Sequence, residues 1–84
     1  MLINAAAVLS HDVVIDDFAT IGPGCTITGR VHIGRGSYLG GGATVRDGVS
    51  IGASVTVGAG AVVVSDVADG LTVAGVPARP LPER

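Results

Sequence analysis

Residues 21–39 read IGPGCTITGRVHIGRGSYL and place an aliphatic residue at every sixth position. The same spacing continues in both directions, without an insertion, from Ile3 to Val63. The full set is Ile3, Leu9, Ile15, Ile21, Ile27, Ile33, Leu39, Val45, Ile51, Val57 and Val63. An α-helix cannot keep a six-residue repeat on one face, because its own period is 3.6 residues. The repeat therefore predicts short strands, each followed by a corner.

A second row of residues tells which side of each strand faces inward. Four residues after each aliphatic position comes a small or β-branched residue, for example Cys25, Val31 and Ser37. Alternate residues of a strand share a face, so this residue and the next aliphatic one point inward and the residue between them points outward. The predicted outward residues are Val8, Val14, Thr20, Thr26, His32, Tyr38, Thr44, Ser50, Thr56, Val62 and Ala68.

Glycine closes many of the corners, as a backbone with positive φ would require. The residues concerned are Gly24, Gly36, Gly42, Gly48 and Gly60. Strands of this length, joined by corners at a fixed period, predict a parallel β-helix.

Composition limits the class of protein. A chain of 84 residues forms at most one small domain, and a net charge of −2 argues against a nucleic-acid surface. No apolar run approaches the roughly 18 residues of a membrane span, and the first residues lack the pattern of a signal peptide. We therefore expect a cytoplasmic protein that binds neither membrane nor nucleic acid. Cys25 is the only cysteine, which excludes a disulfide framework and a thiolate metal cluster.

The repeats IGPGCT, IGRGSY and VGAGAV resemble those of the hexapeptide-repeat acyltransferases. The tail DVADGLTVAGVPARPL resembles the segment that closes the helix in their acetyltransferase branch, and LSHDVVIDDFATIGPGCTITG is most similar to sugar O- and N-acetyltransferases, including those of sialic acids. The resemblance implies an all-β fold, a left-handed parallel β-helix with three hexads per coil and about three and a half coils. Residues 1–67 would form this β-helix, and residues 68–84 a closing segment of the same domain.

Three hexads per coil stack the corners into three edges. We call the first the glycine edge, with Asn4-Ala5-Ala6, Gly22-Pro23-Gly24, Gly40-Gly41-Gly42 and Gly58-Ala59-Gly60. The charged edge carries Ser10-His11-Asp12, Thr28-Gly29-Arg30, Arg46-Asp47-Gly48 and Val64-Ser65-Asp66. The third edge carries Asp16-Asp17-Phe18, Gly34-Arg35-Gly36 and Gly52-Ala53-Ser54.

The glycine edge has two interpretations. Glycine can simply satisfy the geometry of the corners, or the bare backbone can be a track for a long, thin ligand. The resemblance implies the second, with the pantetheine arm of acetyl-CoA against Gly41 and Ala59. The cofactor-binding residues expected from it are Thr20, Gly41, Gly42, Ala59, Gly60, Gly75 and Arg79. The guanidinium of Arg79 suits a CoA phosphate, although it can also be a solvated charge of the tail.

His11 and Asp12 are the expected catalytic pair. By itself, a histidine at a corner is an ordinary solvated residue, but the resemblance implies a general base followed by an acidic residue at this place. Acetyl transfer to a hydroxyl or amine of a sugar, sugar nucleotide or similar small acceptor needs such a base. A neighbouring carboxylate can orient the imidazole. Because His11 and the glycine edge lie on different edges, the site is expected across a subunit boundary of a homotrimer.

His32 is expected to point outward, one coil from His11 and too far away to share a metal ion with it. The related γ-class carbonic anhydrases use three zinc histidines, a pattern that two histidines at this spacing do not meet. We therefore expect no metal site.

Two departures from the family support a different function. Thr20 stands where the amino-sugar acetyltransferases often have a second histidine, and those enzymes carry an N-terminal α/β domain and further coils before the His-Asp motif. The alternative to an acetyltransferase is a non-catalytic trimeric β-helix module, or a truncated fragment without the acceptor-binding domain.

Overall fold

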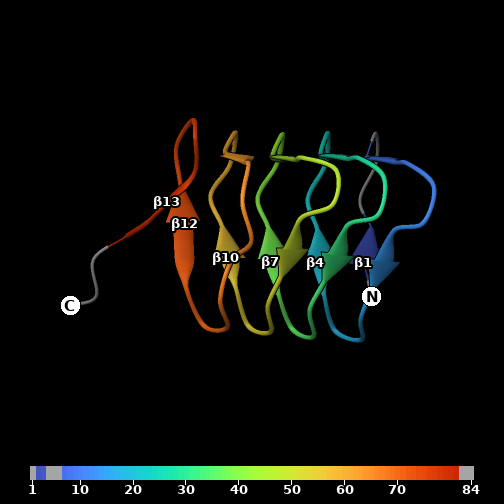
Figure 1. Ribbon diagram of the computed structural model, residues 1–84, viewed down its shortest axis with the longest axis horizontal. Helices are drawn as coiled ribbons and strands as arrows, with labels where there is room; N and C mark the ends of the chain where they lie inside the picture. The colour runs from blue at the N-terminus through green and yellow to red at the C-terminus, as the bar shows by residue number, and fades with distance from the viewer. Residues whose placement is uncertain (1, 4–6, 82–84) are drawn as a thin grey trace.

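The computed structural model describes residues 2–3 and 7–81, and their regular structure consists of short strands (Figure 1). The strands are β1 Leu2–Ile3, β2 Val8–Leu9, β3 Val14–Ile15, β4 Thr20–Ile21, β5 Thr26–Ile27, β6 His32–Ile33, β7 Tyr38–Leu39, β8 Thr44–Val45, β9 Ser50–Ile51, β10 Thr56–Val57, β11 Val62–Val63, β12 Thr72–Ala74 and β13 Arg79–Pro80. In this part of the chain, no helix is long and apolar enough to cross a membrane.

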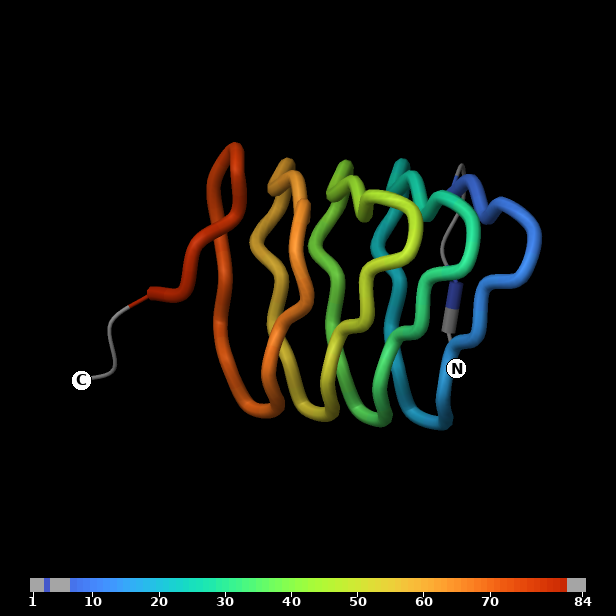
Figure 2. Tube along the Cα trace, viewed as in Figure 1, coloured from blue at the N-terminus to red at the C-terminus, as the bar shows by residue number. Residues whose placement is uncertain are grey.

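The strands form three parallel faces of a solenoid, whose coils follow one another along the long axis of the molecule (Figure 2). The first face is β1-β4-β7-β10-β12, with β13 added antiparallel at its end; the second is β2-β5-β8-β11, and the third is β3-β6-β9. Neighbouring strands pair at an offset of 18 residues, as Thr20 does with Tyr38. The parallel β-helix predicted from the repeat is thus confirmed, and each of its three edges stacks equivalent corners.

The core is a stack of the inward residues of successive coils. The aliphatic row from Ile21 to Val63 is fully buried, and so are the small residues between its members, including Cys25 and Ser37. Polar atoms in this row find backbone partners: the Cys25 thiol donates to the Gly40 carbonyl at 3.1 Å, and the Ser37 hydroxyl donates to that of Gly52 at 2.7 Å. The inward positions predicted from the sequence are therefore confirmed from Ala19 onward.

The first coil is much less buried than the coils that follow. Ile3 and Leu9 each keep 38% of their surface exposed, whereas Ile27 and Leu39 are completely buried. Among the described residues, no further coil packs on the outer side of this first one. Its aliphatic residues therefore pack on one side only.

The last coil is two residues shorter than the others. Val67 bridges Ile51, and Thr72 pairs with Thr56, in both cases at an offset of 16 residues. Ala68 consequently leads into a corner, although the regular repeat predicts it as an outward residue in mid-strand. The shortening occurs on the charged edge, at residues 64–66.

The corners need glycine for two different reasons. Their third residue has positive φ, at Gly42 and Gly60 as predicted but also at Phe18 and Arg30. On the glycine and third edges, the glycine at the first position is crowded by the next coil: a Cβ on Gly40 would lie 2.6 Å from the Ala59 nitrogen. The middle residue is subject to neither constraint, and side chains of many kinds occupy it.

Candidate functional site

His11 and Asp12 lie together at the first corner of the charged edge, and both side chains are exposed (79% and 77%). The His11 Nδ1 and Asp12 Oδ2 atoms are 3.9 Å apart, which is too far for a hydrogen bond. The carboxylate therefore lies within reach of the imidazole but does not fix it in this structure. Catalytic hydrogen bonds are often this long before substrate binds.

The imidazole of His11 lies over the backbone of Gly29, one coil further along the same edge. A Cβ built on Gly29 would be 2.9 Å from His11 Cε1 and 3.1 Å from Nδ1. The backbone joins the two corners as well, because the Arg30 N–H donates to the His11 carbonyl at 3.3 Å. Sequence reasoning did not identify this contact, although the shared corner position of His11 and Gly29 is visible in the 18-residue register.

The glycine edge is a column of almost bare backbone. Its expected first corner, Asn4-Ala5-Ala6, lies outside the described residues. Gly42 has φ +73° and Gly60 has φ +71°, so both are glycine for a conformational reason. Gly41 differs, because a Cβ built on it would meet its nearest atom, the Pro23 carbonyl oxygen, at 3.4 Å, which is an ordinary contact. The fold thus accommodates a side chain at position 41, and the sequence leaves it empty.

Backbone donors along this edge divide into two kinds. Gly40 donates to Val57 at 2.8 Å, and Gly42 to Pro23 at 2.9 Å, so the first and third corner residues bond to neighbouring coils. The N–H groups of the middle residues, Gly41 and Ala59, do not take part in this described ladder. They are the backbone donors that this edge can offer to a ligand.

Of the remaining expected cofactor residues, Thr20 and Gly75 lie next to the glycine edge, whereas Arg79 lies beside the charged edge. Thr20 lies on β4, half-buried, two residues before the corner that begins at Gly22. Gly75, with φ +97°, follows β12 in the turn that ends the column. Arg79, on β13, lines a hollow of about 140 Å³ together with Ser65 and Asp66 of the charged edge.

The structure does not bring the predicted catalytic and cofactor residues together within one chain. His11 and Asp12 lie on the charged edge, while Gly41, Gly42, Ala59 and Gly60 lie on the glycine edge. The whole second face, β2-β5-β8-β11, separates the two edges.

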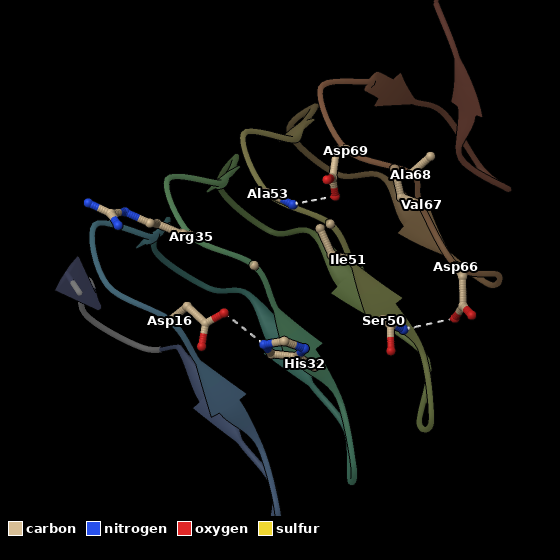
Figure 3. A pocket seen from close by; sticks show the side chains of 12 residues that line it. Asp16, His32, Arg35, Ser50, Ile51, Ala53, Asp66, Val67, Ala68 and Asp69 are labelled. Atoms are coloured by element: carbon tan, nitrogen blue, oxygen red, sulfur yellow. Dashed lines mark hydrogen bonds and ion pairs between the residues drawn. The ribbon is translucent and has the colours of Figure 1, made fainter.

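A broad groove of about 570 Å³ runs along the third face (Figure 3). At one end of it, His32 Nε2 and Asp16 Oδ2 lie 2.8 Å apart, a contact that sequence reasoning missed although the two residues are diagonal neighbours in the 18-residue register. At the other end, Asp66 accepts from the Ser50 N–H at 2.8 Å and Asp69 from the Ala53 N–H at 2.9 Å. The Asp66 carboxylate replaces a backbone acceptor beside the shortened coil, and the Asp69 carboxylate supplies an acceptor for the N–H of a middle corner residue. Both carboxylates therefore have a structural role in the groove. Among the described residues, no three His, Cys, Asp or Glu side chains cluster as a metal ion would need.

The family described as "Bacterial transferase hexapeptide (six repeats)" matches residues 30–65. No curated protein sequence matches the chain significantly. Solved structures do match it over nearly its whole length, and three of them are among the most similar.

A mutant of perosamine N-acetyltransferase from Caulobacter crescentus, in complex with CoA and GDP-perosamine, is 40% identical with a TM-score of 0.94. The acetyltransferase domain of PglB from Neisseria gonorrhoeae, in complex with acetyl-CoA, is 49% identical with a TM-score of 0.92. WeeI from Acinetobacter baumannii is 41% identical with a TM-score of 0.90. The first match covers 95% of this chain and the other two cover 93%.

The chain spans only 38–39% of the length of these three structures. Over that span, the repeat, the coil geometry and the level of identity agree. The resemblance to the hexapeptide-repeat acetyltransferases is thereby confirmed.

Proposed function

We propose that this chain is the β-helical core of an acetyltransferase that moves the acetyl group of acetyl-CoA to a hydroxyl or amine of a sugar or sugar nucleotide. The observation that carries the proposal is that two edges of the β-helix present different chemical groups. One edge is bare backbone with free donors, and the other presents an exposed histidine beside a carboxylate. The similar structures that contain CoA, acetyl-CoA or GDP-perosamine support the same chemistry.

The glycine edge fits the donor, because the pantetheine arm of acetyl-CoA is long, thin and carries amide groups. Gly41 leaves open a space that a methyl group would fill, and the N–H groups of Gly41 and Ala59 can donate to the arm. Gly42, Gly60 and Gly75 keep the rest of the track free of side chains. Arg79 supplies a fork of donors suited to a CoA phosphate. Thr20 supplies a hydroxyl beside the corner that begins at Gly22.

His11 is the general base in this proposal. When bound, acetyl-CoA supplies an acetyl group activated as a thioester. His11 takes the proton that the attacking hydroxyl or amine loses, and Asp12 stabilises the imidazolium that results. As the new bond to the acetyl carbon forms, the bond from that carbon to the CoA sulfur breaks, and His11 returns the proton to the departing sulfur.

Because the two edges lie on either side of the second face, the complete site forms between chains. We propose a homotrimer in which the charged edge of one subunit meets the glycine edge of the next. The second face, lying between these two boundaries, has an outward row without charge: Val8, Thr26, Thr44 and Val62. Protein interfaces are depleted of charge at their centre, which fits this row. The described aspartates all lie outside this row, along the charged and third edges.

Isothermal calorimetry with acetyl-CoA tests the proposal. We expect binding that weakens with added salt, because salt screens the contact between Arg79 and a CoA phosphate. Binding should also weaken in Arg79→Ala, because that variant lacks the contact. We expect His11→Ala to bind acetyl-CoA nearly as well as the parent while losing acetyl transfer and any slow thioester hydrolysis. If a folded trimer does not bind millimolar acetyl-CoA, the enzyme proposal fails and a non-catalytic β-helix module is the better account.

A further inference from the structure

Gly29 occupies a corner position at which the backbone does not require glycine. It is the middle residue of its corner, and the middle residues elsewhere in the described regular coils are His11, Asp17, Pro23, Arg35, Gly41, Asp47, Ala53 and Ala59. Gly29 is not among the residues with positive φ, so its backbone suits any side chain. The geometry of the corner therefore does not explain the glycine at this position.

The space that a Cβ would take at Gly29 is already filled by His11. The built Cβ lies 2.9 Å from Cε1 and 3.1 Å from Nδ1 of the ring, while its nearest backbone neighbour, the His11 carbonyl oxygen, is 3.5 Å away. The conflict is therefore with the ring rather than with the backbone. Because the His11 side chain is largely exposed, Gly29 is a principal support for its orientation.

We infer that Gly29 is a positioning residue for the general base, an inference that rests on the proposed function. The ring leans on Gly29 through Nδ1 and Cε1, and Nδ1 is also the nitrogen that faces Asp12. Nε2 is left to accept the proton of the acceptor. A side chain at position 29 tilts the ring away and moves Nε2 out of line with the proton that it removes from the acceptor.

Gly29→Ala is the test, with Asp17→Ala as the matched control, because Asp17 is an exposed middle corner residue on the third edge, away from the proposed subunit boundary. We expect kcat of Gly29→Ala to fall by about tenfold to a hundredfold, the cost of a displacement near 1 Å. KM for acetyl-CoA should stay within about twofold of the value for the parent. The substitution does not change the interactions that bind acetyl-CoA equally well in the ground state and in the transition state. Asp17→Ala should leave both constants unchanged.

NMR of the His11 ring gives a readout that does not depend on turnover. In the parent and in Asp17→Ala, we expect contacts between the ring Cε1 proton and the Gly29 α-protons. In Gly29→Ala, we expect altered ring ¹⁵N shifts and loss of the contacts to residue 29. Unchanged ring shifts, or an unchanged kcat in an active enzyme, would overturn the inference.

Stability separates a conflict with the ring from one with the backbone. The double variant His11→Ala/Gly29→Ala removes the ring, so any destabilisation caused by Gly29→Ala should disappear in it. If Gly29→Ala destabilises the protein equally when His11 is absent, the backbone requires the glycine and the inference fails. Failure of the proposed function is recognised separately, by the absence of acetyl-CoA binding to the parent.

Discussion

The carboxylate of Asp66 accepts a hydrogen bond from the backbone N–H of Ser50 at 2.8 Å, at a place where the regular coils present a backbone carbonyl. In the preceding coil, the equivalent N–H of His32 donates to the Val49 carbonyl at 3.2 Å. Two residues are missing from the last coil, so no carbonyl stands in the equivalent place opposite Ser50. A side-chain carboxylate thus replaces the backbone acceptor of the hydrogen-bond ladder where the repeat is interrupted.

Asp66→Ala should lower the free energy of unfolding by about 1–2 kcal/mol, because it leaves the Ser50 N–H without its charged acceptor. Asp66→Asn keeps an acceptor oxygen and should lose less. Urea unfolding measures both, with Asp47→Ala, exposed on the same edge, as the control. Equal stability of the Asp66→Ala and Asp47→Ala variants would contradict this role for Asp66.

Two adjacent glycines should respond to alanine in opposite ways. In Gly40→Ala, the new Cβ meets the Ala59 backbone at 2.6 Å, so we expect a loss of stability of about 1–3 kcal/mol or more from overpacking. Gly41→Ala meets no such contact and should fold normally. If the donor lies on this edge, its added methyl group should weaken acetyl-CoA binding by about tenfold, or 1.4 kcal/mol.

Thermal melts and calorimetry on the two variants separate these effects. A Gly41→Ala variant with normal stability and normal acetyl-CoA affinity would exclude position 41 from the donor track. The bare edge would then reflect corner geometry alone at its other positions.

The regular part of the fold could be predicted from the sequence because the signal is local and repeated. Each coil buries the same two rows, so the spacing of six fixes which residues face inward and which coils pair. The shortened coil was not predicted, because the aliphatic row was followed only as far as Val63. Asp69 stands at the next expected aliphatic position and shows that the spacing of six ends there. Val67 and Val73 resume the spacing two residues early, and this phase shift is the signal that could have located the shortening.

The candidate site was only partly accessible from the sequence. The adjacency of His11 and Asp12 follows from the chain, and the stacking of Gly41 over Pro23 follows from the repeat. The direction of the His11 ring depends on a side-chain torsion and on the empty space at Gly29. A repeat pattern contains neither of these.

The same substitution should have different costs at the two ends of the β-helix. Leu39→Ala removes a completely buried side chain and should cost about 2–5 kcal/mol. Leu9→Ala, at a residue 38% exposed, should cost clearly less because its cavity opens to solvent. Urea unfolding gives the two values, and amide exchange should be faster in residues 7–15 than in residues 39–63. Slower exchange in the first coil of a trimer without end-to-end stacking would show this prediction to be wrong.

The proposed trimer predicts that charge is tolerated on the third face and not on the second. Thr44→Lys puts an ammonium in the uncharged row between Thr26 and Val62, where desolvation at a subunit boundary is costly. Ser50→Lys puts the same group in a groove that Asp66 and Asp69 line, where it stays solvated. In sedimentation equilibrium, we expect the parent and Ser50→Lys to be trimers at micromolar concentration and Thr44→Lys to dissociate. A parent that is monomeric throughout would contradict the trimer itself, and a stable Thr44→Lys trimer would move the subunit boundary away from the second face.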